Sequence, residues 1–191
     1  LHKKFLITAQ GHQNAEGERE AIQRFNDLLC DGYVLNSRHL SDDELREFAQ
    51  QPTPFVLVDR LVPGLESRCI TFDHIDAAKQ ATQYLIKQGH RHIGCISGQS
   101  TRESGRLRYQ GYADALREAN IPINPILYAE GDYRQASGYL AAQKLFTANP
   151  EMTAIFSASE ETAGGALQFF HEHEIRVPEQ ISIISYHSIE R

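Results

Sequence analysis

The segment 98–112 carries the densest group of side chains that could bind a ligand. It contains Arg102, Ser104 and Arg108, and it directly follows the apolar run 93–97. A guanidinium presents a planar fork of N–H donors that can bridge two neighbouring hydroxyl groups or hold a carboxylate. A role in solvating a helix N-terminus is less favoured, because the helix dipole prefers anions there. The segment therefore predicts one wall of a site for a polar small molecule.

Single polar or aromatic residues also follow the other apolar runs of the chain. They are Asp59 after 55–58, Tyr133 after 126–128, Ser159 after 154–156 and His187 after 181–184. The carboxyl ends of parallel strands share one edge of a sheet, where open α/β folds bind ligands. Hydrogen-bonding groups can hold sugar hydroxyls, and an aromatic ring can stack on the apolar face of a sugar. Each residue alone is better explained as an ordinary loop residue, so it is their convergence that predicts a sugar site.

Motifs of the common α/β enzymes do not occur in the sequence. There is no Gly-x-Ser-x-Gly elbow, no phosphate-binding P-loop and no Gly-x-Gly-x-x-Gly turn. The pairs His90/His92 and His171/His173 lack further ligands at metal-binding spacing, which favours solvated histidines. We therefore expect no enzymatic activity, no metal and no cofactor.

An α/β enzyme acting on a sugar is the least favoured alternative. It would need an acid/base pair, and only Asp59 with Glu160 or His187 could supply one.

Composition and charge narrow the possible classes of protein. The chain has 191 residues, 41% of them hydrophobic, which is enough to bury the core of one domain or of two small lobes. Its 19 Lys and Arg against 25 Asp and Glu give a formal charge of −6, so any DNA-binding surface must lie outside these residues. No apolar run approaches the ~18 residues of a membrane helix. Three widely spaced cysteines indicate free thiols in a reducing cytosol.

Short apolar runs alternate with stretches of helical period along the whole chain. The expected strands are 5–8, 33–35, 55–58, 93–97, 126–128, 154–156 and 181–184, and the expected helices are 15–29, 41–51, 76–88, 106–119, 135–146 and 160–174. Strands joined by single helices lie parallel with right-handed crossovers, which predicts a doubly wound α/β fold. The stretch 59–73 shows no helical pattern, and it is either the approach to a hinge between two lobes or a long surface loop.

One helix start is readable in detail. Ser41 and Glu44 have the spacing of a capping box, in which each side chain satisfies a free backbone N–H of the other.

Five motifs occur in a characteristic order. They are Asp-Gly-Tyr-Val-Leu at 31–35, Pro-Phe-Val-Leu-Val-Asp-Arg at 54–60, Gly-His-Arg-His-Ile-Gly at 89–94, Arg-Tyr-Gln-Gly-Tyr-Ala-Asp-Ala-Leu at 108–116 and Val-Pro-Glu-Gln-Ile-Ser-Ile-Ile at 177–184. Together they resemble the lactose/galactose repressor family of bacterial transcription regulators over nearly the whole chain. The segments 40–45, 62–64 and 68–69 look closest to the galactose repressor and isorepressor branch.

This resemblance implies a two-lobed, periplasmic-binding-protein-like effector core. Residues 1–72 would form the N-terminal lobe and residues 73–191 the C-terminal lobe, both incomplete, and the helix-turn-helix headpiece would be absent from this chain. The family further implies a cytoplasmic, homodimeric repressor. In it, a sugar or sugar derivative bound between the lobes allosterically changes the affinity for operator DNA.

The resemblance also assigns site residues. Asp59 falls on a family Asp that contacts the effector, Arg108 on a family Arg, and Tyr133 on the aromatic that stacks on the ligand. Arg102 and Ser104 fall on loop positions that line the cleft, and Asn36 is a further candidate on the same wall as Asp59.

Two departures from the family pattern concern the same site. Ser159 and Glu160 replace Asn-Asp, and the segment 185–188 replaces Gly-Tyr/Phe-Asp-Asp, so that His187 stands where an Asp would accept bonds from sugar hydroxyls. A neutral imidazole could accept one such bond, and a protonated one would favour an anionic sugar.

The main alternative is an extracytoplasmic sugar-binding protein that feeds a transporter. Such a protein needs a secretion signal. The sequence starts at Leu1 without an initiator Met, and we expect it to be part of a longer protein. The start of the reading frame therefore discriminates a helix-turn-helix from an apolar leader.

Overall fold

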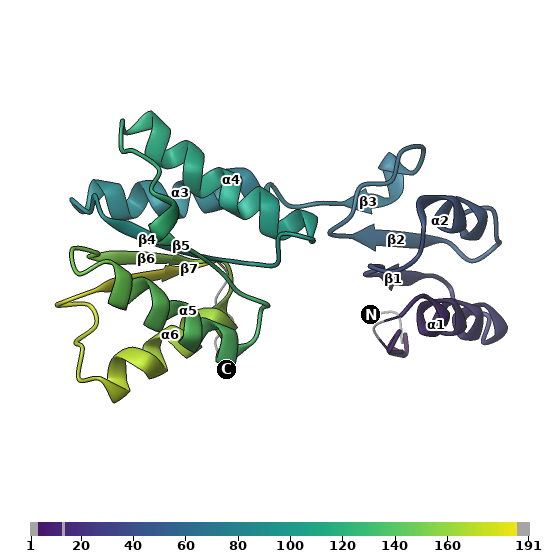
Figure 1. Cartoon of the computed structure of the whole chain (residues 1–191). Coiled ribbons are helices and arrows are strands. Elements are labelled where there is room, and N and C mark those ends of the chain that lie inside the picture. The colour runs from purple at the N-terminus through teal and green to yellow at the C-terminus, as the bar shows by residue number, and fades with distance from the viewer. Residues whose placement is uncertain (1–3, 13, 187–191) are drawn as a thin grey trace. The chain divides into compact units, whose positions relative to one another are not determined.

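The computed structural model describes residues 4–12 and 14–186. It divides the chain into two compact units, Leu1–Phe72 (unit 1) and Asp73–Arg191 (unit 2). Each unit has a parallel sheet with helices (Figure 1).

Unit 1 contains, among the described residues, a parallel sheet in the order β1-β2-β3. Its elements are α1 (Ala15–Asp27), β1 (Tyr33–Leu35), α2 (Asp42–Phe48), β2 (Phe55–Val58), the 3-10 helix η1 (Glu66–Arg68) and β3 (Cys69–Ile70). Tyr33 is in register with Phe55 and Leu57 with Cys69. The core is one apolar cluster that includes Ile22 of α1 and Leu45 of α2.

The capping box at the start of α2 is confirmed. The Ser41 side chain accepts from the backbone N–H of Glu44, and the Glu44 side chain accepts from the backbone N–H of Ser41 at 2.9 Å. This reciprocal pair fixes where the chain turns from the loop after β1 into the helix.

Unit 2 contains, within residues 73–186, a parallel sheet in the order β5-β4-β6-β7. Its elements are α3 (His74–Lys87), β4 (Ile93–Ser97), α4 (Glu103–Glu118), η2 (Pro125–Leu127), β5 (Tyr128–Glu130), α5 (Gln135–Ala148), β6 (Ala154–Ser157), α6 (Glu160–Glu172) and β7 (Ser182–Ser185). Helices α3 and α4 cover one face of the sheet, and α5 and α6 cover the other (Figure 1).

The buried strands of unit 2 supply both cores. On β4, Ile93 and Cys95 belong to the cluster under α3 and α4, whereas Ile96 belongs to the cluster under α5 and α6. On β6, Phe156 and Ile155 divide in the same way. Because both faces of these strands are covered, apolar residues point to both sides until the serine that ends each strand.

The predicted fold class, α/β with parallel doubly wound sheets, is confirmed, but one strand and several boundaries differ. The predicted strand 5–8 is wrong: residues 4–10 have no regular structure, with Phe5 97% and Leu6 91% exposed. A strand forms only where its backbone N–H and C=O groups pair with a neighbouring strand. Among the described residues, β1 pairs with β2, and residues 4–10 form no strand beside it.

The other differences concern boundaries. Helix α4 begins at Glu103 rather than at residue 106, so Ser104 lies in the helix and not in the loop before it. The stretch 126–128 starts as the 3-10 helix η2, because the Asn124 side chain caps it by accepting from the Ile126 N–H, so β5 begins at Tyr128. The stretch 59–73 is not without regular structure, because it contains η1 and β3, and β3 extends the sheet beside β2.

None of the helices in the described part of the chain has the length and apolar character needed to cross a membrane.

Candidate functional site

Tyr133 is the centre of a polar cluster at the carboxyl edge of the unit 2 sheet. Its hydroxyl lies 3.4 Å from Ser104 Oγ, and its ring centroid lies 5.5 Å from the guanidinium carbon of Arg102 and 5.9 Å from that of Arg108. The structure therefore brings together four of the predicted residues. They come from the β4–α4 loop, from α4 and from the loop after β5.

The backbone is adapted to place this ring. Tyr133 has φ +65°, a left-handed conformation that is uncommon for an aromatic residue. Such conformations cost on the order of 1–3 kcal/mol and cluster at ligand sites. A Cβ atom on Gly98 would lie 1.9 Å from the Tyr133 hydroxyl, so only a glycine leaves room for the ring after β4.

Arg108 is held from three sides. Its Nη1 donates to the carbonyl oxygen of Ala158 at 2.6 Å, its Nε donates toward His74 Nδ1 at 3.5 Å, and its guanidinium stacks 3.8 Å from the ring centroid of Tyr186. The ion pairs among the described residues include neither Arg108 nor Arg102. Both guanidinium groups can therefore offer N–H donors to a ligand.

Ser159 lies beside this cluster but has another task. It is the N-cap of α6, where its Oγ accepts from the Thr162 N–H at 3.2 Å, and it also lies 3.1 Å from Thr162 Oγ1. Ser159 is only 6% exposed. A structural role thus accounts for Ser159, and its ligand role stays a prediction.

His187 lies outside the described residues, so its predicted role also stays a prediction.

The two candidates in unit 1 lie at the carboxyl ends of neighbouring strands. Asn36 follows β1 and Asp59 follows β2, and both residues are exposed. Asp59 has φ +60°, and its N–H donates to the carbonyl oxygen of Ile70 at 2.8 Å. This bond fixes the turn that presents the Asp59 carboxylate at the end of the sheet.

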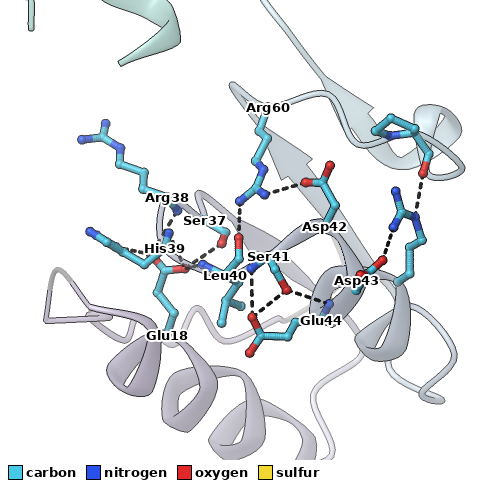
Figure 2. Close-up of polar contacts among 12 residues, drawn as sticks. Glu18, Ser37, Arg38, His39, Leu40, Ser41, Asp42, Asp43, Glu44 and Arg60 are labelled. Carbon is cyan, nitrogen blue, oxygen red and sulfur yellow. Dashed lines mark hydrogen bonds and ion pairs between the residues drawn. The ribbon is translucent and has the colours of Figure 1, made fainter. Parts of the chain in front are cut away.

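Glu18 organises the loop that follows Asn36 (Figure 2). Its carboxylate accepts from Ser37 Oγ at 2.6 Å, from His39 Nδ1 at 2.8 Å, and from the backbone N–H groups of Arg38, His39 and Leu40 at 3.0, 3.3 and 3.3 Å. Burial by itself raises the pKa of Glu18, but these hydrogen bonds, from Ser37 first, outweigh it and lower the pKa below its usual value. A buried carboxylate on α1 thus locks the loop 37–40.

Arg60 ties the end of β2 to the same region. Its Nη1 donates to the carbonyl oxygen of Leu40 at 2.8 Å, and its Nη2 pairs with Asp42 Oδ1 at 2.6 Å (Figure 2). The segments that carry Asn36 and Asp59 are therefore cross-linked within unit 1.

A cavity of about 1030 Å³ in unit 1 is not this polar site. It lies between residues 4–9, α1 and β1, and its walls are mostly apolar side chains such as Phe25. Of the predicted binding residues, only Asn36 lines it. The cavity marks the side of β1 that no described strand covers.

One histidine of each pair has a structural partner. His90 Nδ1 lies 2.9 Å from Thr153 Oγ1, and His173 Nδ1 lies 2.8 Å from the carbonyl oxygen of Phe169. Among the described residues, no three His, Cys, Asp or Glu side chains are placed to share a metal ion.

Comparison with known proteins shows the family of the chain. A family profile described as "periplasmic binding proteins and sugar binding domain of LacI family" matches residues 2–190. The chain belongs to the LacI family. It is 30% identical over 188 residues to the HTH-type transcriptional regulator GalS of Salmonella typhimurium strain LT2, covering 98% of this chain and 55% of GalS. It is 32% identical over 185 residues to GalR of Escherichia coli strain K12, covering 97% of this chain and 54% of GalR.

A solved LacI-family structure has the same fold. It is a sugar-binding transcriptional regulator from Escherichia coli, complexed with phosphate, with a TM-score of 0.83 and 32% identity over 96% of this chain and 66% of that one. The LacI-family chain spans about half the length of these curated relatives. The relatives are transcriptional regulators rather than enzymes.

Proposed function

We propose that this LacI-family chain is the effector-sensing core of a cytoplasmic, sugar-responsive transcriptional repressor. Residues 1–72 and 73–191 would be its N-terminal and C-terminal lobes, each completed by other parts of the protein. The observation that carries the proposal is the cluster of Arg102, Ser104 and Arg108 around the Tyr133 ring.

The cluster has the chemistry of a sugar site. An aromatic face binds the C–H face of a pyranose, and guanidinium forks and a serine hydroxyl bind its hydroxyl groups in the plane of the ring. On the other lobe, Asp59 would accept hydrogen bonds from sugar hydroxyls, with Asn36 beside it on the loop that Glu18 holds in place. Two lobes that each bind part of one ligand give the ligand a preference for one lobe arrangement.

Through that preference, ligand binding would change the affinity of the protein for operator DNA. A ligand shifts an equilibrium between two arrangements only by its differential affinity for them, typically ~1–3 kcal/mol. In a homodimer, the lobes would pass this change to helix-turn-helix headpieces on operator DNA. This chain has 25 acidic and 19 basic residues, and this acidic balance supports a separate DNA-binding part. The GalS and GalR relatives favour this function over an extracytoplasmic sugar-binding protein.

The test is isothermal titration of the 191-residue chain with D-galactose, D-glucose, D-galacturonate and D-glucose 6-phosphate. We expect saturable binding of at least one of them, lost in Tyr133→Ala. The control is Tyr84→Ala, which alters an exposed tyrosine on α3. Failure of all four to bind, or equal binding by Tyr133→Ala and the unaltered chain, would contradict the proposal.

A further inference from the structure

His74 is a buried titratable residue that takes no part in the proposed sugar contacts. It is the first residue of α3, directly after the N-cap Asp73, and it is 6% exposed. Its Nδ1 lies 2.8 Å from the hydroxyl of Tyr186 and 3.5 Å from Nε of Arg108. A side chain from the start of unit 2 thus meets two residues that lie 34 and 112 positions further along the chain.

The chemistry of these three groups defines the role of each. An arginine Nε–H can only donate, so the Nδ1 atom that faces it must offer a lone pair. The same lone pair is within reach of the Tyr186 hydroxyl at 2.8 Å, which can donate to it. The network therefore selects the imidazole tautomer with an unprotonated Nδ1, which turns an acceptor toward Arg108.

Tyr186 adds a second constraint. It follows β7 directly, and the centroid of its ring lies 3.8 Å from the guanidinium carbon of Arg108, close enough for a flat stack. The ring fixes the plane of the guanidinium, His74 fixes the rotation of its Nε edge, and the Ala158 carbonyl holds Nη1 at 2.6 Å. Few rotamers of Arg108 satisfy all three.

We propose that His74 and Tyr186 are positioning residues that pre-organise Arg108 for its ligand. This inference rests on the proposed function for the identity of the ligand, but the positioning itself belongs to the unliganded chain. An arginine side chain has many rotamers and therefore a large rotamer entropy. A guanidinium already locked in the binding geometry loses less of that freedom when a sugar arrives, which raises the affinity without any contact between sugar and His74.

The first measurement needs no ligand. In ¹⁵N-edited NMR spectra, the Arg108 Nε–H signal, assigned by its absence in Arg108→Lys, should exchange slowly with water. We expect this protection to persist in His74→Asn, whose side-chain amide can still present an acceptor near the Nδ1 position. We expect it to be lost in His74→Leu. His90→Leu is the matched control, because His90 lies at the opposite, amino end of β4.

The second measurement is titration of the same variants with the four sugars of the panel. For a sugar that binds, His74→Leu should weaken binding by about tenfold, as expected for the loss of a hydrogen bond to a charged group. His74→Asn should stay within about threefold of the unaltered chain, and Tyr186→Phe, which keeps the ring, should fall between them. In an Arg108→Lys background, His74→Leu should have no further effect, because its action runs through Arg108.

The outcomes separate the two proposals. A protected Nε–H signal that His74→Leu leaves unchanged overturns the positioning role. Equal losses of affinity from His74→Leu with and without Arg108 overturn it as well, since they would indicate a general structural effect. A signal that depends on His74 in a chain that binds none of the four sugars refutes the proposed function and leaves the positioning role standing.

Discussion

Replacing Glu18 by Gln tests whether one buried carboxylate holds the loop beside Asn36. In the native loop, Glu18 Oε1 accepts from the Arg38 N–H at 3.0 Å, whereas Oε2 accepts from the His39 and Leu40 N–H groups, both at 3.3 Å. A glutamine amide has one acceptor oxygen and one NH₂ group that can only donate. Whichever way the amide turns, at least one backbone N–H then faces another donor.

The size of the effect follows from that mismatch. Leaving a buried donor unsatisfied costs about 1–3 kcal/mol, and the bonds lost here are to a charged group. We therefore expect Glu18→Gln to destabilise the loop by about 2 kcal/mol, or roughly 30-fold in its opening equilibrium. Glu20→Gln, an exposed change on the same helix, should alter stability by less than about 0.5 kcal/mol.

Hydrogen exchange of the Arg38 and Leu40 amides measures the opening of this loop directly, because both amides donate to Glu18. Protection at these amides should fall roughly 30-fold in Glu18→Gln and stay unchanged in Glu20→Gln. Equal protection in all three proteins would refute the assignment of Glu18 as the anchor of the loop.

The same group predicts a pH dependence. The folded pKa of Glu18 lies below its usual value of 4.5. Stability from this carboxylate is therefore fully present above about pH 4.5 and is lost as the pH falls through the folded pKa. Protection of the Arg38 amide should drop below pH 4.5 in the unaltered chain, and Glu18→Gln should lack that drop.

Three further predictions concern unit 2. Gly98→Ala should weaken sugar binding by more than about tenfold in titration while shifting the unfolding midpoint little, because the new Cβ would lie 1.9 Å from the Tyr133 hydroxyl; unchanged affinity would contradict the placement of the ring. Tyr112→Phe should destabilise unit 2 by about 1–2 kcal/mol in urea unfolding, because its buried hydroxyl donates to the Ile93 carbonyl at 2.7 Å; a change below 0.5 kcal/mol would count against that bond. Burial raises the pKa of the Cys95 thiol, so a thiol reagent at pH 8 should label Cys30 in the folded chain and Cys95 only after unfolding; labelling of both at one rate would contradict the burial.

The sequence predicts the elements of unit 2 well because its signals there are local and agree. Runs with apolar residues pointing to both faces, such as 93–96, are typical of strands covered on both faces, and the structure covers β4 on both. The strand expected at 5–8 failed for the opposite reason. Its pattern was right for a strand, but a strand also needs a neighbour, and no pattern within 5–8 can say whether one is present.

The site shows the same division. Arg102, Ser104 and Arg108 could be predicted because they lie in one polar segment that follows a strand, and Tyr133 because it follows the next strand. Ser159 also follows a strand, yet its hydroxyl serves as a helix cap, a competing role that Ser-x-x-Thr spacing at a helix start could have suggested.

His74, Tyr186 and Glu18 were missed because their roles exist only in three dimensions. His74 and Tyr186 meet across 112 residues, and Glu18 reaches a loop 19 to 22 residues away. A lone histidine at a helix start or a glutamate on an amphipathic helix reads as an ordinary surface residue until its partners are placed.

The most direct test of the proposed sugar site is titration of the isotopically labelled chain with the tightest-binding sugar of the panel, followed by NMR. We expect saturable shifts with one common dissociation constant at Arg102, Ser104, Arg108 and Tyr133, which lie together in unit 2. The same titration tests the proposed ligand contacts of Asn36 and Asp59, which predict saturable shifts at these two residues. Saturable shifts that spare the Tyr133 cluster and appear only at residues remote from it would contradict the proposed function.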